Sequence, residues 1–264
     1  MTTLETVTSK DGTTITFERL GAGPPVVLVC GGSVDRMAKA GLAALLASDF
    51  TVFNFDRRGR GESGDTPPYA VDREIEDIDA VIDAAGGSAG LYGISSGAAL
   101  ALEAARQLGA KVTKLALFEP PYIGDPAARP PADQVEQYNR MIAEGRRGDA
   151  ADYFMEKVVG LPAEFVAQAR TSPSRAGQEA LAHTLAYDAT IMGDYSVPTE
   201  AAAQVAQPTI VIDGSASFPF MHETAQTLAA ALPEGQSRTL EGQRHDVDPR
   251  VLAPVLKEFF AGRG

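Results

Sequence analysis

The chain of 264 residues is long enough for one large α/β domain, or for a core domain with an insertion, so several domains are not expected. Its 35 acidic and 23 basic residues give a formal net charge of −12, and no basic run exceeds a pair such as Arg146-Arg147, which argues against nucleic acid as a partner. The N-terminus MTTLETVTSKDG lacks a signal pattern, and no stretch approaches the roughly 20 apolar residues of a membrane helix. We expect a cytoplasmic protein without a membrane partner, and the single cysteine, Cys30, agrees with a reducing compartment.

The first half of the sequence alternates between strand and helix patterns. Segments rich in Thr, Val, Ile and Phe at 2–8 and 13–19 flank Lys10-Asp11-Gly12, which predicts a hairpin. Further strands are predicted at 24–30, 51–56, 89–94 and 111–119, and helices at 35–48, 70–85 and 96–108. This alternation predicts a mostly parallel, eight-stranded sheet with helices on both faces.

The alternation stops after Pro120, and helical patterns without a convincing strand continue to Gln207. We expect a core domain of residues 1–120 and 208–264, with residues 121–207 inserted as a helical cap. The core pattern resumes with strands at 208–214 and 237–242, a helix over MHETAQTLAAAL between them, and a final helix that Asp248 caps and Pro249 begins.

Two serines stand where a predicted strand becomes a predicted helix, in Gly93-Ile94-Ser95-Ser96-Gly97. This run fits Gly-x-Ser-x-Gly, the sharp turn that lifts a serine nucleophile above the end of a sheet. The two glycines flank Ser95 at the spacing of the motif, so Ser95 is the candidate nucleophile and Ser96 offers its backbone N–H. The alternative interpretation is an ordinary turn of glycine and serine.

A base must take the proton of such a serine, and the chain has three histidines. His245 lies in EGQRHDVDP, directly after the last predicted strand, and it is the candidate base. His183 lies in the insertion and His222 in the first turn of a helix. Both fit surface or packing roles, and His222 is the one expected to approach the substrate.

These residues and the order of elements resemble the α/β-hydrolase family over essentially the whole chain. VVLVCGGS resembles the family's strand and His-Gly-x loop, although Cys30 stands where histidine is common. The resemblance implies an oxyanion hole made by the N–H groups of Gly32 and Ser96, with Ser33 beside the substrate. FDRRGRGESG, at 55–64, resembles the Asp-x-Arg-Gly-x-Gly-x-Ser loop, which implies an architectural role in which Asp56 and Arg58 bond the backbone.

The usual acid of the family is missing, because Gly214-Ser215-Ala216-Ser217 stands where Gly-x-x-Asp is expected. Asp213 precedes that glycine, so its side chain is expected to point elsewhere. Glu119 ends a predicted strand in LALFEPPY and is the better candidate, with a loop-capping carboxylate as the alternative. Haloalkane dehalogenases are similar in carrying a glutamate after this strand, and zearalenone lactonases are similar in combining Ser, His and Glu.

The resemblance implies acyl transfer by Ser95, His245 and Glu119, with no metal and no cofactor. We expect a small, uncharged and fairly apolar ester or lactone as substrate, with Tyr122 and Met192 of the insertion facing the site. The chain is expected to be a monomer or a homodimer. The alternatives are a small-molecule-binding relative without hydrolytic activity, and a C–C bond hydrolase, thioesterase or perhydrolase on the same scaffold.

Overall fold

The computed structural model describes residues 4–262, and they form one eight-stranded sheet in the order β1-β2-β4-β3-β5-β6-β7-β8. β2 pairs antiparallel with both of its neighbours, and every other pair is parallel. The strands in chain order are β1 (Leu4–Thr8), β2 (Thr14–Leu20), β3 (Pro25–Val29), β4 (Thr51–Phe55), β5 (Ala89–Ile94), β6 (Val112–Phe118), β7 (Thr209–Gly214) and β8 (Gly235–Leu240). The predicted sheet is therefore confirmed, while residues 2 and 3 of its first predicted strand lie outside the described residues.

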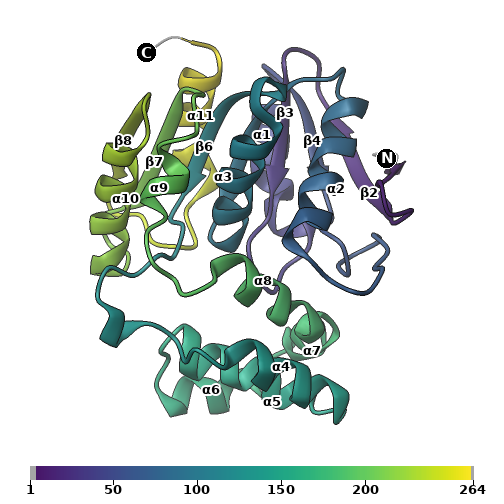
Figure 1. The fold of residues 1–264 in the computed structure, drawn as a ribbon, viewed down its shortest axis with the longest axis vertical. Helices are drawn as coiled ribbons and strands as arrows, with labels where there is room; N and C mark the ends of the chain where they lie inside the picture. Colours follow the sequence, from purple (N-terminus) through teal and green to yellow (C-terminus); the bar gives the residue numbers. More distant parts are fainter. Residues whose placement is uncertain (1–3, 263–264) are drawn as a thin grey trace.

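Helices cover both faces of this sheet (Figure 1). α2 (Val71–Ala84), α3 (Ser96–Leu108) and α10 (Pro219–Ala231) pack on one face, and α1 (Ala40–Leu46) and α11 (Pro249–Phe260) pack on the other. The central strands β5 and β7 are buried along their whole length, which explains the uninterrupted apolar sequence of β5 and the apolar run at the centre of β7. Asp248 caps α11 as predicted, because its carboxylate accepts from the backbone N–H of Arg250 at 2.9 Å.

One predicted helix is divided in the structure. The pattern over residues 35–48 predicts a continuous helix, but Arg36–Lys39 forms a 3₁₀ turn and α1 begins at Ala40. Asp35 caps that turn, and the Asp56 carboxylate accepts from the backbone N–H of Arg36 at 2.8 Å. This side-chain contact to the loop after β4 holds the first turn away from regular α-helical geometry.

The chain between β6 and β7 is helical throughout its regular structure. It contains α4 (Gln134–Ala143), α5 (Arg147–Tyr153), α6 (Ala163–Ala169), α7 (Arg175–Leu181), α8 (Leu185–Met192) and α9 (Thr199–Ala202). In Figure 1, α4 to α7 gather below the sheet, and α8 lies between this group and α3. Tyr138, Met141 and Leu185 belong to a small apolar core that α4, α5 and α8 share. Among the described residues, no helix is long and apolar enough to cross a bilayer.

Because β5, β6, β7 and β8 are parallel neighbours, their carboxyl ends meet at one edge of the sheet. The backbone N–H of Ser95 donates to the carbonyl of Phe118 at 3.0 Å, and the N–H of Glu119 donates to the carbonyl of Ile212 at 2.9 Å. Ser95 and Glu119 are thus held in register directly beyond β5 and β6.

Candidate active site

Ser95 occupies a strained turn between β5 and α3. Its φ of 57° and ψ of −132° lie in a region that non-glycine residues rarely adopt, at a cost of about 1–3 kcal/mol. A Cβ atom on Gly93 would lie 2.4 Å from the carbonyl oxygen of Gly97, and a Cβ on Gly97 would lie 2.3 Å from the carbonyl oxygen of Cys30. Both glycines of the motif are therefore required by close backbone packing, which the interpretation as an ordinary turn does not need.

Glu119 is fully buried and every contact of its carboxylate has a defined donor. Oε1 accepts from the backbone N–H of Gly214 at 2.8 Å, and Oε2 accepts from the hydroxyl of Ser217 at 2.9 Å. Oε2 also lies 2.7 Å from Nδ1 of His245. Glu119 has a φ of 45°, so backbone strain occurs at this residue as well as at Ser95. The carboxylate is thus fixed by two neighbours before it contacts the histidine.

His245 lies in the loop after β8, and 37% of its side chain is exposed. The 2.7 Å distance between Nδ1 of His245 and Oε2 of Glu119 suits a hydrogen bond that Nδ1 donates, and this arrangement would leave Nε2 free to accept a proton. No hydrogen bond joins His245 to Ser95 within residues 4–262, and catalytic hydrogen bonds are often long in sites without substrate.

The loop after β3 packs against the Ser95 turn. A Cβ atom on Gly31 would lie 3.0 Å from the Cβ of Ser95, and one on Gly32 would lie 3.5 Å from Oγ of Ser96. Ser96 is the first residue of α3, where backbone N–H groups have no partner within the helix. Ser33 follows with a φ of 58° and is half-buried. Two glycines and a helix start therefore lie beside the candidate nucleophile.

Asp213 and His222 form a separate pair. Oδ2 of Asp213 lies 3.0 Å from Nδ1 of His222, and Oδ1 accepts from the hydroxyl of Thr239 at 2.9 Å. The side chain of His222 is 50% exposed, and Gln226 contacts its other nitrogen. The structure thus brings Asp213 to His222, whereas His245 contacts Glu119.

The remaining predicted residues, Tyr122, Met192 and His183, belong to the insertion. Tyr122 and Met192 are buried and line a cavity of about 330 Å³ beside α2, α3 and α8. Neither Ser95 nor His245 is among the described residues that line it. His183 lies 3.3 Å from an Arg147 nitrogen, and its burial lowers the pKa of the ring.

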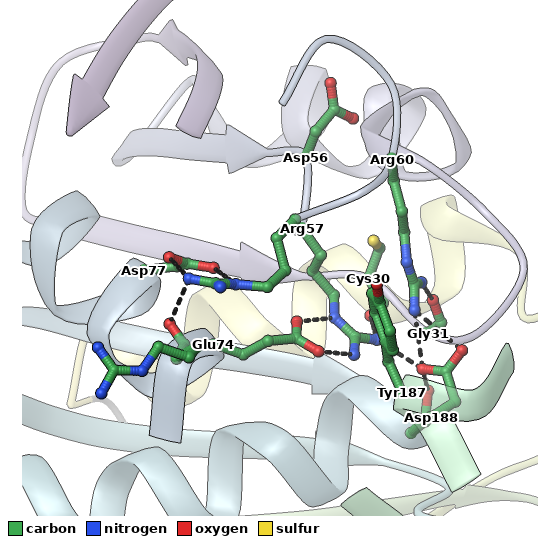
Figure 2. Close-up of polar contacts among 12 residues, drawn as sticks. Cys30, Gly31, Asp56, Arg57, Arg60, Glu74, Asp77, Tyr187 and Asp188 are labelled. Carbon is green, nitrogen blue, oxygen red and sulfur yellow. Dashed lines mark hydrogen bonds and ion pairs between the residues drawn. The ribbon is translucent and has the colours of Figure 1, made fainter. Parts of the chain in front are cut away.

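The loop after β4 holds a buried network of charges that sequence reasoning missed (Figure 2). Arg57 donates two hydrogen bonds of 2.7 Å to Glu74, and its third nitrogen donates to Asp188 at 2.9 Å. Arg60 donates to both carboxylate oxygens of Asp188, at 2.8 and 2.9 Å. The hydroxyl of Ser96 donates to the same carboxylate at 2.8 Å. Asp188 lies on α8, so the network joins the insertion to the turn that carries Ser95.

Charge pairing stabilises this network in its ionised form. Burial alone would raise the pKa of Asp188, but the charges of Arg60 and Arg57 outweigh it, and the pKa of the carboxyl is lowered. Asp56 accepts from the backbone N–H of Arg36 and Glu62, as expected for an architectural residue. Arg58, expected to bond mainly backbone, instead pairs with the carboxylates of two buried or half-buried residues, Asp77 and Asp11, and donates once to a carbonyl.

Two signals in the sequence could have indicated this network. FDRRGRGESG places three arginines in a loop between apolar segments, and buried arginines need carboxylate partners. EALAHTLAYDATIM places Asp188 in a helix that is otherwise nearly uncharged. What the sequence could not show is that these two distant segments meet.

Cys30 is the first residue of the loop after β3. Its thiol is fully buried, as expected for a small apolar residue, and Sγ lies 3.7 Å from the carbonyl oxygen of Val34. Burial raises the pKa of the thiol. The carbonyl groups of Cys30 and Gly31 accept hydrogen bonds from Arg57 and Arg60, the first at 3.3 Å.

The family model described as "Alpha/beta hydrolase family" matches residues 26–255, from β3 into the last helix. The chain belongs to the alpha/beta hydrolase family. No curated protein matches the sequence significantly.

Solved structures of this family resemble the chain along its whole length. An alpha/beta hydrolase from Sphaerobacter thermophilus is 54% identical, with a TM-score of 0.90, over 97% of this chain and 100% of that one. A thermophilic esterase from Thermogutta terrifontis is 22% identical, with a TM-score of 0.77, over 98% of both chains. A haloalkane dehalogenase from Bradyrhizobium elkani is 21% identical, with a TM-score of 0.72, over 99% of this chain and 98% of that one. The last two show the shared alpha/beta hydrolase fold.

Proposed function

We propose that the chain is a serine hydrolase that cleaves an ester or lactone bond through Ser95, His245 and Glu119. The observation that carries this proposal is the 2.7 Å contact between the His245 ring and the Glu119 carboxylate, at the strand edge where Ser95 occupies its strained turn. Acyl transfer by a serine uses a nucleophile, a base that takes its proton, and an acid that orients the base.

In the proposed reaction, Oγ of Ser95 attacks the carbonyl carbon of the substrate while Nε2 of His245 takes the hydroxyl proton. Glu119 keeps Nδ1 protonated and stabilises the positive charge that develops on the ring. The N–H groups of Gly32 and Ser96 hold the oxygen that becomes negative in the tetrahedral intermediate.

The intermediate collapses when the bond to the alcohol oxygen breaks and His245 returns its proton to that oxygen. A water molecule then attacks the acyl group on Ser95, with His245 as base, and the acid product leaves after the serine recovers its proton. Water supplies the second nucleophile, so the steps balance without a further reactant.

We also propose that residues 121–207 act as a cap that forms most of the substrate pocket, with Ser33 and His222 as candidate contacts. The cavity that Tyr122 and Met192 line has neither Ser95 nor His245 among its described lining residues, so it does not support these two side chains as substrate contacts. A strongly negative chain repels anionic substrates, so a small, uncharged and fairly apolar ester or lactone is favoured. A thermophilic esterase occurs among the structural neighbours, which agrees with an ester substrate.

The test compares the wild-type chain with Ser95→Ala on short p-nitrophenyl esters and on a panel of lactones. We expect a loss of at least about 10³-fold in kcat for the variant, since only binding and oxyanion stabilisation remain. Ser174→Ala, on the exposed surface of the insertion, is the matched serine control and should keep full activity.

Labelling separates catalysis from mere binding. A fluorophosphonate should modify Ser95 in the wild-type chain and in the control, and peptide mass spectrometry identifies the modified residue. Equal hydrolysis by the wild type and Ser95→Ala, or an unmodified Ser95, would contradict the proposal and favour a binding protein. Cleavage of C–C or thioester substrates by Ser95 would retain the triad and replace the substrate class.

A further inference from the structure

The Asp188 carboxylate is the point where the insertion meets the backbone that would hold the oxyanion. Asp188 lies in α8, whereas its three partners Arg57, Arg60 and Ser96 belong to the sheet domain. It is almost fully buried, so these contacts are shielded from water and from salt. One cap residue therefore contacts the two segments that supply Gly32 and Ser96.

The first of these segments is the loop after β3. Arg60 donates to the carbonyl of Gly31, and the same guanidinium is held by Asp188 (Figure 2). In a planar trans peptide, the C=O of one residue and the N–H of the next point in opposite directions. Fixing the Gly31 carbonyl toward Arg60 therefore fixes the Gly32 N–H in the opposite direction. Arg57 acts in the same way on the peptide of Cys30 and Gly31, through its 3.3 Å contact to the Cys30 carbonyl.

The second segment is the start of α3. The Ser96 hydroxyl donates to Asp188 at 2.8 Å, and this contact restrains the residue whose N–H is the other candidate donor. A Cβ atom on Gly32 would lie 3.0 Å from Oδ2 of Asp188, so the carboxylate also packs directly against the loop. Both donors are thus set by contacts to the same side chain.

We propose that Asp188 is a positioning residue that aligns the two oxyanion-hole donors and makes their alignment depend on the docking of cap helix α8. This inference rests on the proposed function, because it concerns the same serine site. Asp188 acts through Arg60, Arg57 and Ser96, and its carboxylate forms no hydrogen bond with Ser95 in the described part of the chain. The consequence is that the N–H groups of Gly32 and Ser96 are aligned only when α8 is docked on the sheet domain.

The test uses Asp188→Asn, which keeps the shape of the side chain and removes its charge. Misaligned donors weaken transition-state binding but not ground-state binding, so kcat should fall by about 10- to 100-fold while KM changes by less than about threefold. The inhibition constant of an alkyl boronic acid, whose serine adduct carries a negative tetrahedral boron, should rise about as much as kcat falls. Hydrogen exchange in peptides covering residues 30–34 should become faster.

Tyr187→Phe is the matched control, because Tyr187 precedes Asp188 on α8 and its hydroxyl donates to Asp65 at 2.8 Å, outside the contacts of Asp188. Its kinetics, boronate affinity and exchange should remain those of the wild type. If Asp188→Asn does not fold, Ser96→Ala replaces it, and kcat should then fall by about threefold to tenfold with KM unchanged. If both variants fold, the double variant should lose no more than Asp188→Asn alone.

The proposal is overturned if Asp188→Asn raises KM and leaves kcat and the boronate constant unchanged, or if exchange in residues 30–34 stays at the wild-type rate. Failure of the proposed function looks different. A wild-type chain that hydrolyses none of the esters contradicts that function, and the exchange measurement then decides the role of Asp188 without any substrate.

Discussion

Two buried carboxylates lie close to the Ser95-Ser96 turn, and they differ in what holds them. Glu119 accepts from a backbone N–H, a hydroxyl and an imidazole, none of which carries a permanent charge. Asp188 accepts from the guanidinium groups of Arg57 and Arg60, which are always charged, and from one hydroxyl. Figure 2 shows the guanidinium groups of Arg57 and Arg60 beside Asp188.

Because of this difference, the negative charge of Glu119 is not neutralised by a permanent positive charge, whereas that of Asp188 is. In the proposed reaction a proton moves onto His245, and the negative charge of Glu119 would stabilise the new positive charge. The charge of Asp188 is already matched by its arginines, so it fixes geometry and has no proton to follow. We therefore expect two carboxylates near one turn to differ in role: Glu119 would stabilise a charge, and Asp188 would fix the position of its neighbours.

The largest effect on kcat is expected from removing the negative charge of Glu119. Glu119→Gln keeps the size and a hydrogen-bonding oxygen but removes the negative charge, so kcat should fall by about 10³- to 10⁴-fold. Initial rates on the best p-nitrophenyl ester measure it. Asp213→Asn is the matched control, since Asp213 contacts His222 and Thr239, and it should change kcat by less than about threefold. A damaging Asp213→Asn beside a mild Glu119→Gln would reverse the assignment.

The free energy of unfolding should fall at acid pH as Asp188, which pairs with two arginines, becomes protonated. The pKa of Asp188 is lowered in the folded chain, because the charges of Arg60 and Arg57 outweigh the opposing effect of burial. Its contribution to stability is therefore complete above the unfolded pKa and is lost as the pH falls through the folded pKa. Each such group steepens the fall in free energy of unfolding by up to about 1.4 kcal/mol per pH unit below about pH 4.

Urea unfolding at pH 7, 5, 4 and 3 measures this slope in the wild type and in Asp188→Asn. The variant has lost the carboxylate at every pH, so it should be less stable at pH 7 and should lose less on acidification. Asp11 has a lowered pKa through Arg58, and its slope remains in both chains. Parallel curves for the two chains would contradict the assignment of the acid-sensitive group.

The smallest effect tests how firmly Glu119 is held. Ser217→Ala removes the 2.9 Å hydrogen bond to Oε2 and leaves Gly214 and His245 in place, so kcat should fall by about threefold to tenfold. Ser215→Ala is the control on the same loop, because its hydroxyl accepts from the N–H of Gly242 and does not contact Glu119. Equal kcat values for the two variants would show that Gly214 and the strand alone fix the carboxylate.

The sequence predicted the sheet because each buried parallel strand is a short apolar run bounded by turn residues, as at 89–94. It also singled out Glu119, since a carboxylate directly after such a run must lie at the strand edge. The contacts of Asp188 could not be predicted, because 128 residues separate it from Arg60 and the intervening insertion has no regular pattern that fixes its docking. The cavity beside Tyr122 and Met192 depends on the same docking.

Cys30 gives the molecule a practical property. It is the only cysteine of the chain, and its thiol is fully buried with a raised pKa, so thiol-directed reagents should leave the folded protein unmodified. A cysteine introduced on the insertion, for example at the exposed Phe165 of α6, would then be the single reactive thiol. A spin label or fluorophore attached there would test whether the insertion moves relative to the sheet, and the native sequence of the loop after β3 stays intact.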